Sequence, residues 1–131
     1  MTIELQLEAA TSAGYVHLPF AHPAVLTLTS AGDMRDRERR MRILARIGID
    51  PGSLLRCRQI HSRIVWAAED LEAPAARDDD TLPEGDGLVS GPGGPWLAVG
   101  VGDCMPILLA DRRTRAYAAL HSGWRGTGVL E

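Results

Sequence analysis

Several features are scarce in this 131-residue sequence, and each scarcity excludes a class of protein. No apolar run approaches the roughly 18 residues that a membrane-spanning helix needs. The first ten residues carry acidic side chains and lack the basic start of a secretory signal, so we expect a cytoplasmic protein. The net charge of −3 is too small to attract nucleic acid or an anionic membrane in bulk.

Cysteine is scarce as well, since only Cys57 and Cys104 are present. Without a secretory signal, reduced thiols are favoured over a disulfide. The close Cys-x-x-Cys pairs that are typical of structural zinc sites are absent. The glycine cluster at residues 91–95 lacks the Lys and Ser/Thr of a phosphate-binding loop.

The remaining composition is that of an ordinary globular protein, with 45% hydrophobic and 24% charged residues. A chain of this length can bury about two-thirds of its unfolded surface. Apolar and β-branched patterns predict strands at residues 24–29, 54–66, 86–90, 96–101, 107–110 and 115–121. With one clear helix, they indicate an α/β fold of the mixed α+β type, forming a single domain over residues 1–131.

The predicted helix follows Asp33, which we expect to be its N-cap, carries Asp36 in its first turn and ends at Gly48. Its apolar face has four residues at helical intervals: Met34, Met41, Leu44 and Ile47. Arginines fill most of the rest, and we interpret them as a solvent-exposed face. The acidic segment 67–85 is predicted to be a surface loop, and a second helix is predicted to begin at Thr127.

Three residues have side chains suited to holding a metal ion: His61, Cys104 and His121. Two imidazoles and one thiolate suit a catalytic zinc ion whose fourth position stays open to water. Zinc bound in this way lowers the pKa of a bound water to about 7 and supplies hydroxide at neutral pH. The residues also fit a Cys/His hydrolase, with Cys104 as nucleophile and His121 as base, or a core thiol beside two unrelated histidines.

Two neighbouring residues could add to this chemistry. Asp103 adjoins Cys104 and could orient a histidine or accept a substrate proton, or it could be a simple turn acid. Arg125 lies in a glycine-flanked turn where a helix is expected to begin, which favours binding of an anion. A tight turn with Trp124 packed in the core explains the glycine-flanked position of Arg125 equally well.

Four motifs together resemble the YfiH family, also called the laccase-domain or multicopper polyphenol oxidase family. They are Gln59-Ile60-His61, Asp86-Gly87-Leu88-Val89, the segment from Gly102 to Asp111, and His121-Ser122-Gly123-Trp124-Arg125-Gly126-Thr127. The resemblance implies layered mixed β-sheets flanked by helices, and zinc at His61, Cys104 and His121. We expect Cys104, His121 and Asp103 to act in catalysis. Substrate contacts are expected from Gln59, Ser122, Gly123, Trp124 and Arg125.

The resemblance implies a zinc enzyme that acts on purine nucleosides, by phosphorolysis of inosine or adenosine, by adenosine deamination, or by both. Arg125 would then hold phosphate against the ribose. A Cys/His amidohydrolase that edits a peptidoglycan precursor is one alternative, and a copper polyphenol oxidase is another. Copper fits less well, because blue-copper proteins gather Cys, His and Met in one short loop and only Met105 is near Cys104 here.

Family members are longer than this chain, and we expect it to cover their N-terminal half. The loop that precedes the first long helix, residues 28–33 here, also departs from the family pattern. Self-association or a separate C-terminal half would then complete the fold. An inactive or partner-dependent family member is therefore a further interpretation.

Overall fold

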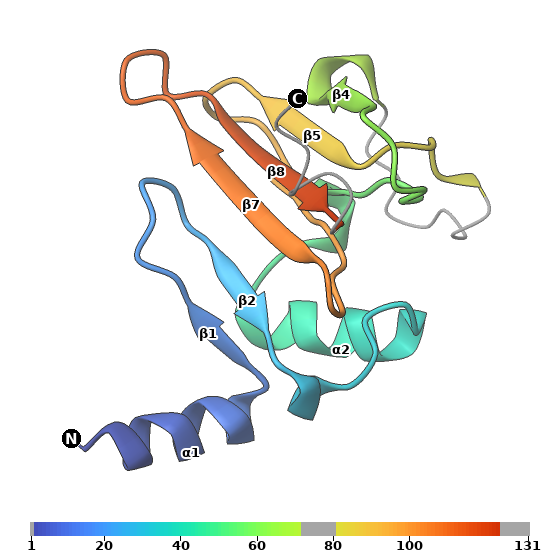
Figure 1. Ribbon diagram of the computed structural model, residues 1–131. Helices are drawn as coiled ribbons and strands as arrows, with labels where there is room; N and C mark the ends of the chain where they lie inside the picture. The colour runs from blue at the N-terminus through green and yellow to red at the C-terminus, as the bar shows by residue number, and fades with distance from the viewer. Residues whose placement is uncertain (1, 72–80, 124–131) are drawn as a thin grey trace. The chain divides into compact units, whose positions relative to one another are not determined.

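The computed structural model describes residues 2–71 and 81–123 (Figure 1). The chain divides into two compact units, Met1–Ile49 and Asp50–Glu131. Helices and mixed sheets are both present, which confirms the predicted α/β fold of mixed type. The helix predicted at Thr127 and part of the predicted loop, residues 72–80, lie outside the described residues. No helix of the described ranges has the length and hydrophobicity to cross a membrane.

The first unit contains two helices, a 3₁₀ turn and one small sheet. In chain order these are α1 (Ile3–Ala13), β1 (Tyr15–His17), β2 (Val25–Thr27), the 3₁₀ turn (Thr29–Ala31) and α2 (Arg37–Ile47). The two strands are antiparallel, with Val16 opposite Leu26. The prediction of a strand within residues 24–29 is therefore confirmed by β2.

Helix α1 was not predicted from the sequence. Its apolar residues Ile3, Leu5 and Leu7 alternate along the chain instead of recurring at helical intervals, and all three are exposed. Local capping explains the helix: the Thr2 hydroxyl accepts from the backbone of Leu5, and Gly14 ends the helix in the left-handed conformation, with φ of 83°. The helix is therefore specified by its ends rather than by a buried face.

Helix α2 begins later than the sequence predicts, because Asp36 and not Asp33 is its N-cap. The Asp36 carboxylate accepts from the backbone N–H of Arg39 at 2.9 Å. Asp33 instead lies in the preceding turn, where it accepts from the backbone and the guanidinium of Arg35. The predicted end is confirmed, since Gly48 is left-handed with φ of 85° and donates to the Leu44 carbonyl.

The buried face of α2 differs from the predicted one. Ile43 and Leu44 are buried, whereas Met41 and Ile47 are only partly buried. Arg40 is also buried, so the interpretation of every arginine here as solvent-exposed is wrong. Its guanidinium donates to the carbonyl oxygen of Met34 at 2.8 Å, in the turn that precedes the helix. Because the charged group is hydrogen-bonded, its apolar stem can pack inside.

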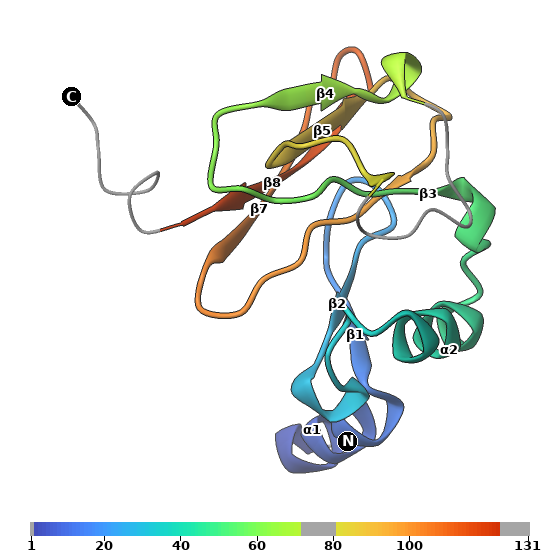
Figure 2. The same ribbon diagram turned by 90° about the vertical axis from the view of Figure 1, so that its right-hand side faces the viewer.

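Over residues 50–71 and 81–123, the second unit contains two sheets. Its strands are β3 (Leu54–Leu55), β4 (Val65–Ala67), β5 (Gly87–Ser90), β6 (Trp96–Leu97), β7 (Met105–Ala110) and β8 (Tyr117–Ser122), with 3₁₀ turns at Pro51–Ser53 and Ala68–Asp70. Strands β3 and β6 form a parallel pair. The larger sheet has the order β4-β5-β8-β7, in which only β4 and β5 are parallel (Figure 2).

Two predicted strands are much shorter than expected. Residues 54–66 form only the strand β3 and the start of β4, and residues 96–101 form only β6. Between β3 and β4 the chain passes close to Asp86, and His61 adopts a left-handed conformation that no strand tolerates. The prediction of a strand over residues 54–66 is therefore confirmed only at residues 54–55 and 65–66, and it is wrong for residues 56–64.

The core of the second unit lies on one face of the larger sheet. Leu55 and Leu88 are each 1% exposed and pack with Ala68, while Trp66 and Cys57 are partly buried against them. Burying a leucine side chain contributes about 1.5–3 kcal/mol. The sheet register places Leu88 opposite Ala119, so this buried face continues across β8.

The opposite face of the same sheet is apolar but poorly covered. Val65, Gly87, Leu120 and Ile107 form one row across the four strands. Beside this row, Met105 and Leu109 of β7 point the same way, because side chains two apart share a face. Val65, Met105 and Leu109 are each about half exposed, at 51%, 52% and 52%.

Candidate metal centre

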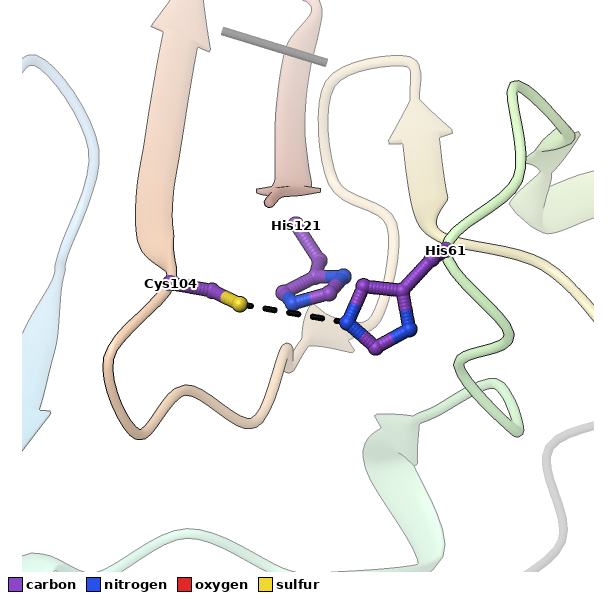
Figure 3. Close-up of side chains that lie close together, drawn as sticks. All are labelled: His61, Cys104 and His121. Carbon is purple, nitrogen blue, oxygen red and sulfur yellow. Dashed lines mark hydrogen bonds between the residues drawn. The ribbon is translucent and has the colours of Figure 1, made fainter. Parts of the chain in front are cut away.

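The three predicted metal ligands meet in one cluster, although they come from three separate segments. His61 lies between β3 and β4, Cys104 directly precedes β7, and His121 lies in β8 (Figure 3). Their candidate ligand atoms all lie within 4.8 Å of one another. The Cys104 Sγ is 3.9 Å from the His61 Nε2, and the two imidazole rings are 5.0 Å apart at 76°.

The β7–β8 register explains how Cys104 meets His121. Pro106 is opposite His121, and Met105 is opposite Ser122. If the alternation of β7 is extended by one residue, Cys104 points to the same face as Pro106 and His121. The hairpin alone therefore supplies two of the three ligands.

Gly123 leaves the space that this cluster needs. A Cβ at this position would lie 3.1 Å from the His61 Cδ2 and 3.8 Å from the Cys104 Sγ. Any side chain would therefore press on the imidazole of His61. Gly123 was predicted to contact the substrate, and its observed place is at the wall of the cluster.

His61 reaches the cluster through an unusual backbone conformation. Its φ is +59°, a region that few residues other than glycine adopt. The Asp86 carboxylate stabilises this turn by accepting hydrogen bonds from the backbone N–H groups of Ile60 (3.2 Å), His61 (3.0 Å) and Ser62 (2.7 Å). The Ser62 hydroxyl donates to the same carboxylate at 2.6 Å.

Asp86 also holds His121. The Asp86 Oδ1 lies 2.8 Å from the His121 Nδ1, and the two side chains are only 3% and 4% exposed. Burial by itself would raise the pKa of Asp86, but hydrogen bonds from Ser62, His121 and Ile60 hold that pKa well below its ordinary range. The carboxylate is therefore charged at neutral pH, and it directs the His121 Nε2 toward the cluster.

Asp86 was missed as a site residue in the sequence analysis, which placed it only at the start of a strand motif. The available signal was an acidic residue directly before a buried apolar strand. That signal is weak on its own, because turn acids are common at such positions. What makes Asp86 important is tertiary: its donors come from residues 60–62 and from residue 121.

The other predicted site residues lie at varying places. Gln59 forms two hydrogen bonds with the backbone of Gly100, one from its Nε2 and one to its Oε1, both 2.7 Å long. Asp103 is exposed beside Cys104, and Ser122 is partly buried at the end of β8. Trp124 and Arg125 lie outside the described residues. The substrate contacts of these residues stay predictions.

The second cysteine does not belong to the cluster. Cys57 packs against the core of the second unit, and burial together with the charge of Asp86 raises its pKa to about 11. Both cysteines are free thiols, as predicted. Cys104 is thus the thiol that is placed to bind a metal.

The donor set fits a four-coordinate metal with one position left for water or substrate. In a tetrahedral zinc site, ligand atoms are separated by about 3.3–3.6 Å, given bonds of about 2.0–2.3 Å. The observed separations are at most 4.8 Å, so side-chain adjustments of about an ångström would close the site. The structure shows a group of three side chains that can bind a metal ion.

Comparison with known proteins places the chain in a family. A family profile described as "Multi-copper polyphenol oxidoreductase laccase" matches residues 21–129. A purine nucleoside phosphorylase from Deinococcus radiodurans is 38% identical over 90 residues, which cover 69% of this chain and 32% of that protein. The adenosine deaminase RL5 from an unknown prokaryotic organism is 32% identical over 122 residues, covering 90% of this chain and 47% of that protein.

A solved structure, YlmD from Geobacillus stearothermophilus, superposes with a TM-score of 0.61 and 28% identity. The match covers 74% of this chain and 37% of YlmD. The chain therefore spans between about a third and a half of the length of the relatives it matches. The predicted family is confirmed: this chain belongs to the multicopper polyphenol oxidoreductase laccase family, to which the name YfiH is also applied.

Proposed function

We propose that this chain carries the zinc centre of an enzyme that acts on purine nucleosides. The observation that carries the proposal is the meeting of His61, Cys104 and His121 in one cluster. The names of the relatives add the substrate class, since they include purine nucleoside phosphorylases and an adenosine deaminase. Zinc is proposed over copper because two imidazoles and one thiolate with an open position form a known catalytic zinc set.

The residues of this chain would divide the work. His61, Cys104 and His121 would hold the metal, which supplies Lewis acidity when bound. Asp103, exposed next to Cys104, would exchange a proton with the substrate. Arg125 would hold the phosphate in phosphorolysis. The remaining predicted substrate contacts are Gln59, Ser122, Gly123 and Trp124.

The test combines metal analysis with turnover. Purified protein and its Cys104→Ala and His121→Ala variants are analysed for zinc and copper, with intact mass measured on the same samples. Zinc-loaded protein is then incubated with inosine or adenosine, with and without phosphate, and the released bases are separated by chromatography. We expect one zinc per chain, lost in both variants, and release of hypoxanthine from inosine, release of adenine from adenosine, or formation of inosine from adenosine. Folded, zinc-loaded protein that is supplied with a C-terminal half and still converts neither nucleoside would contradict the proposal.

A Cys/His amidohydrolase is the second candidate, favoured by the 3.9 Å separation of the Cys104 Sγ and the His61 Nε2. The base in this candidate would be His121, as predicted, or His61, since the candidate ligand atoms of both histidines lie within 4.8 Å of the thiol. A histidine partner activates a thiol as a nucleophile, so metal-free and untreated protein would both be alkylated rapidly by iodoacetamide at Cys104. A metal-bound thiolate would react only after a chelator is added. Peptide mass mapping of the alkylated cysteine separates the two candidates.

The chain's short span relative to its relatives bears on the third candidate, an inactive or partner-dependent family member. This candidate predicts that the zinc-loaded chain has no turnover while it is monomeric. A second copy or a separate C-terminal half would then be required for turnover.

A reducing compartment such as the cytoplasm is proposed as the location of the protein, because Cys104 must stay reduced to bind a metal.

A further inference from the structure

A single oxygen atom of Asp86 is shared by the two histidines of the candidate metal centre. The Oδ1 accepts from the backbone N–H of His61 at 3.0 Å and lies 2.8 Å from the His121 Nδ1. The other oxygen, Oδ2, accepts from the backbone of Ile60 and from both the backbone and the hydroxyl of Ser62. One carboxylate thus bonds to both of the segments that supply imidazoles.

The backbone of Asp86 links the same two segments. Its carbonyl oxygen accepts from the backbone N–H of His121 at 2.7 Å, and its own N–H donates to the Ile64 carbonyl at 2.9 Å. The side chain is only 3% exposed, so water cannot readily replace these donors and acceptors. The position of the carboxylate is therefore set by hydrogen bonds within the protein.

Each histidine depends on the carboxylate in a different way. The left-handed turn at His61 leaves the N–H groups of Ile60, His61 and Ser62 pointing at Asp86, and without an acceptor this turn would relax. Relaxation would carry the imidazole of His61 away from Cys104. His121 depends on the carboxylate for its tautomer, because a proton on Nδ1 leaves the Nε2 lone pair free for a metal.

We propose that Asp86 is a positioning residue that orients both candidate histidine ligands at once. The inference rests on the metal centre of the proposed function but not on its substrate. Substitution of Asp86 should then misorient both His61 and His121, and the protein should bind the metal more weakly.

Substitution by asparagine separates this role from simple packing. Asparagine has nearly the shape of aspartate, but one of its two polar atoms is a donor. If the amide oxygen replaces Oδ1, the NH2 group faces the N–H groups of Ile60 and Ser62. If it replaces Oδ2, the NH2 group faces the His61 N–H and the His121 Nδ1, which favours the tautomer whose Nε2 carries the proton. Either orientation disturbs one histidine.

The experiment measures zinc affinity by competition with a chromophoric chelator, for the wild type and for Asp86→Asn, Ser62→Ala and Asp111→Asn. We expect Asp86→Asn to bind zinc about 10–100-fold more weakly. Ser62→Ala, which removes one donor to Oδ2, should show a smaller loss. Asp111→Asn is the matched control, since Asp111 also accepts backbone and hydroxyl hydrogen bonds but lies in the β7–β8 turn; its zinc affinity should equal that of the wild type.

Cobalt substitution supplies a second readout, which general destabilisation would not change. In Asp86→Asn we expect the thiolate-to-cobalt charge-transfer band of Cys104 to persist while the ligand-field bands, which report the geometry of the histidines, shift. Urea unfolding of the metal-free proteins checks that each variant is folded. Should Asp86→Asn not fold, Ser62→Ala decides, and an unchanged zinc affinity in that variant would overturn the inference.

Other outcomes are equally decisive. A folded Asp86→Asn protein with wild-type zinc affinity and a wild-type cobalt spectrum would overturn the inference, as would a wild type that binds no zinc. Nucleoside turnover is a separate criterion. If zinc affinity falls in Asp86→Asn while the wild type converts no nucleoside, the proposed substrate class fails and the role of Asp86 stands.

Discussion

The side-chain amide of Gln59 pairs with both backbone polar groups of Gly100, from a position 41 residues away in the sequence. One hydrogen bond runs in each direction, so the amide continues the backbone pairing where no strand is present. Gln59 is two residues before His61, and Gly100 is four residues before Cys104. The pair therefore joins the two irregular segments that lead into the cluster.

Replacement of Gln59 by alanine should weaken this junction. Loss of two hydrogen bonds at a partly buried position is expected to lower the free energy of unfolding by about 1–2 kcal/mol. Urea denaturation followed by tryptophan fluorescence measures the change. Gln6→Ala, at an exposed position of α1, is the matched control and should change stability by less than about 0.5 kcal/mol. Equal losses of unfolding free energy in the two variants would show that the hydrogen bonds between Gln59 and Gly100 do not stabilise the fold.

Gly123→Ala should disturb the cluster without removing a ligand. The new Cβ would lie 3.1 Å from the His61 Cδ2, so the imidazole must move. Overpacking of this kind costs about 1–3 kcal/mol, which we expect to appear as weaker zinc binding in chelator competition. Gly91→Ala has no atom within 4 Å of its new Cβ and should leave zinc affinity unchanged. Wild-type affinity in Gly123→Ala would contradict the placement of Gly123 at the wall of the cluster.

The thiol of Cys57 predicts a loss of stability in alkaline solution. Its pKa is raised to about 11 in the folded protein, whereas an unfolded cysteine ionises near pH 8.5. Between these values the folded state binds the extra proton, so the free energy of unfolding should fall as the pH rises. Below about pH 8.5 the thiol is protonated in both states and contributes no slope.

The measurement for Cys57 is a set of urea denaturations across this pH window, performed on the wild type and on Cys57→Ala. The difference between the two proteins isolates the contribution of Cys57. We expect the alanine variant to have the shallower decline. Parallel curves for the two proteins would show that ionisation of Cys57 is not linked to folding.

The uncovered face of the larger sheet predicts concentration-dependent self-association. Val65, Met105 and Leu109 expose apolar surface there, and β7 is an edge strand. Light scattering after size-exclusion chromatography should show a mass that rises with protein concentration in the wild type. Leu109→Lys should shift the protein toward monomer. Leu7→Lys, at an exposed leucine of α1, should not; if it does so equally, general surface hydrophobicity explains the association.

The sequence was informative where local patterns determine structure. Gly48 as the end of α2 could be predicted because a left-handed glycine after a helical repeat is a local signal. The three candidate metal ligands could be named because two imidazoles and a thiolate form a recognisable donor set and the motifs around them resemble a known family. Their meeting in space is what the structure adds.

Other features depend on contacts that no local pattern records. Arg40 was expected in solvent because its neighbours in sequence are charged, yet it is buried by the turn whose carbonyl groups it satisfies. The segment around His61 alternates like a strand, yet it bends around Asp86, whose donors come from residues far along the chain. Tertiary hydrogen bonds overrode the local preference in both cases.

Because the backbone of His61 is left-handed, its imidazole can be removed by substitution while the turn that carries it is kept. Glycine adopts this conformation without a steric cost, so His61→Gly should keep the backbone N–H groups on Asp86 while removing the imidazole. The variant would then contain a ligand-sized gap beside Cys104 and His121. Free imidazole added to the solution should occupy that gap and restore zinc binding. We expect no such rescue for His121→Gly, because His121 lies in a strand and glycine weakens a strand.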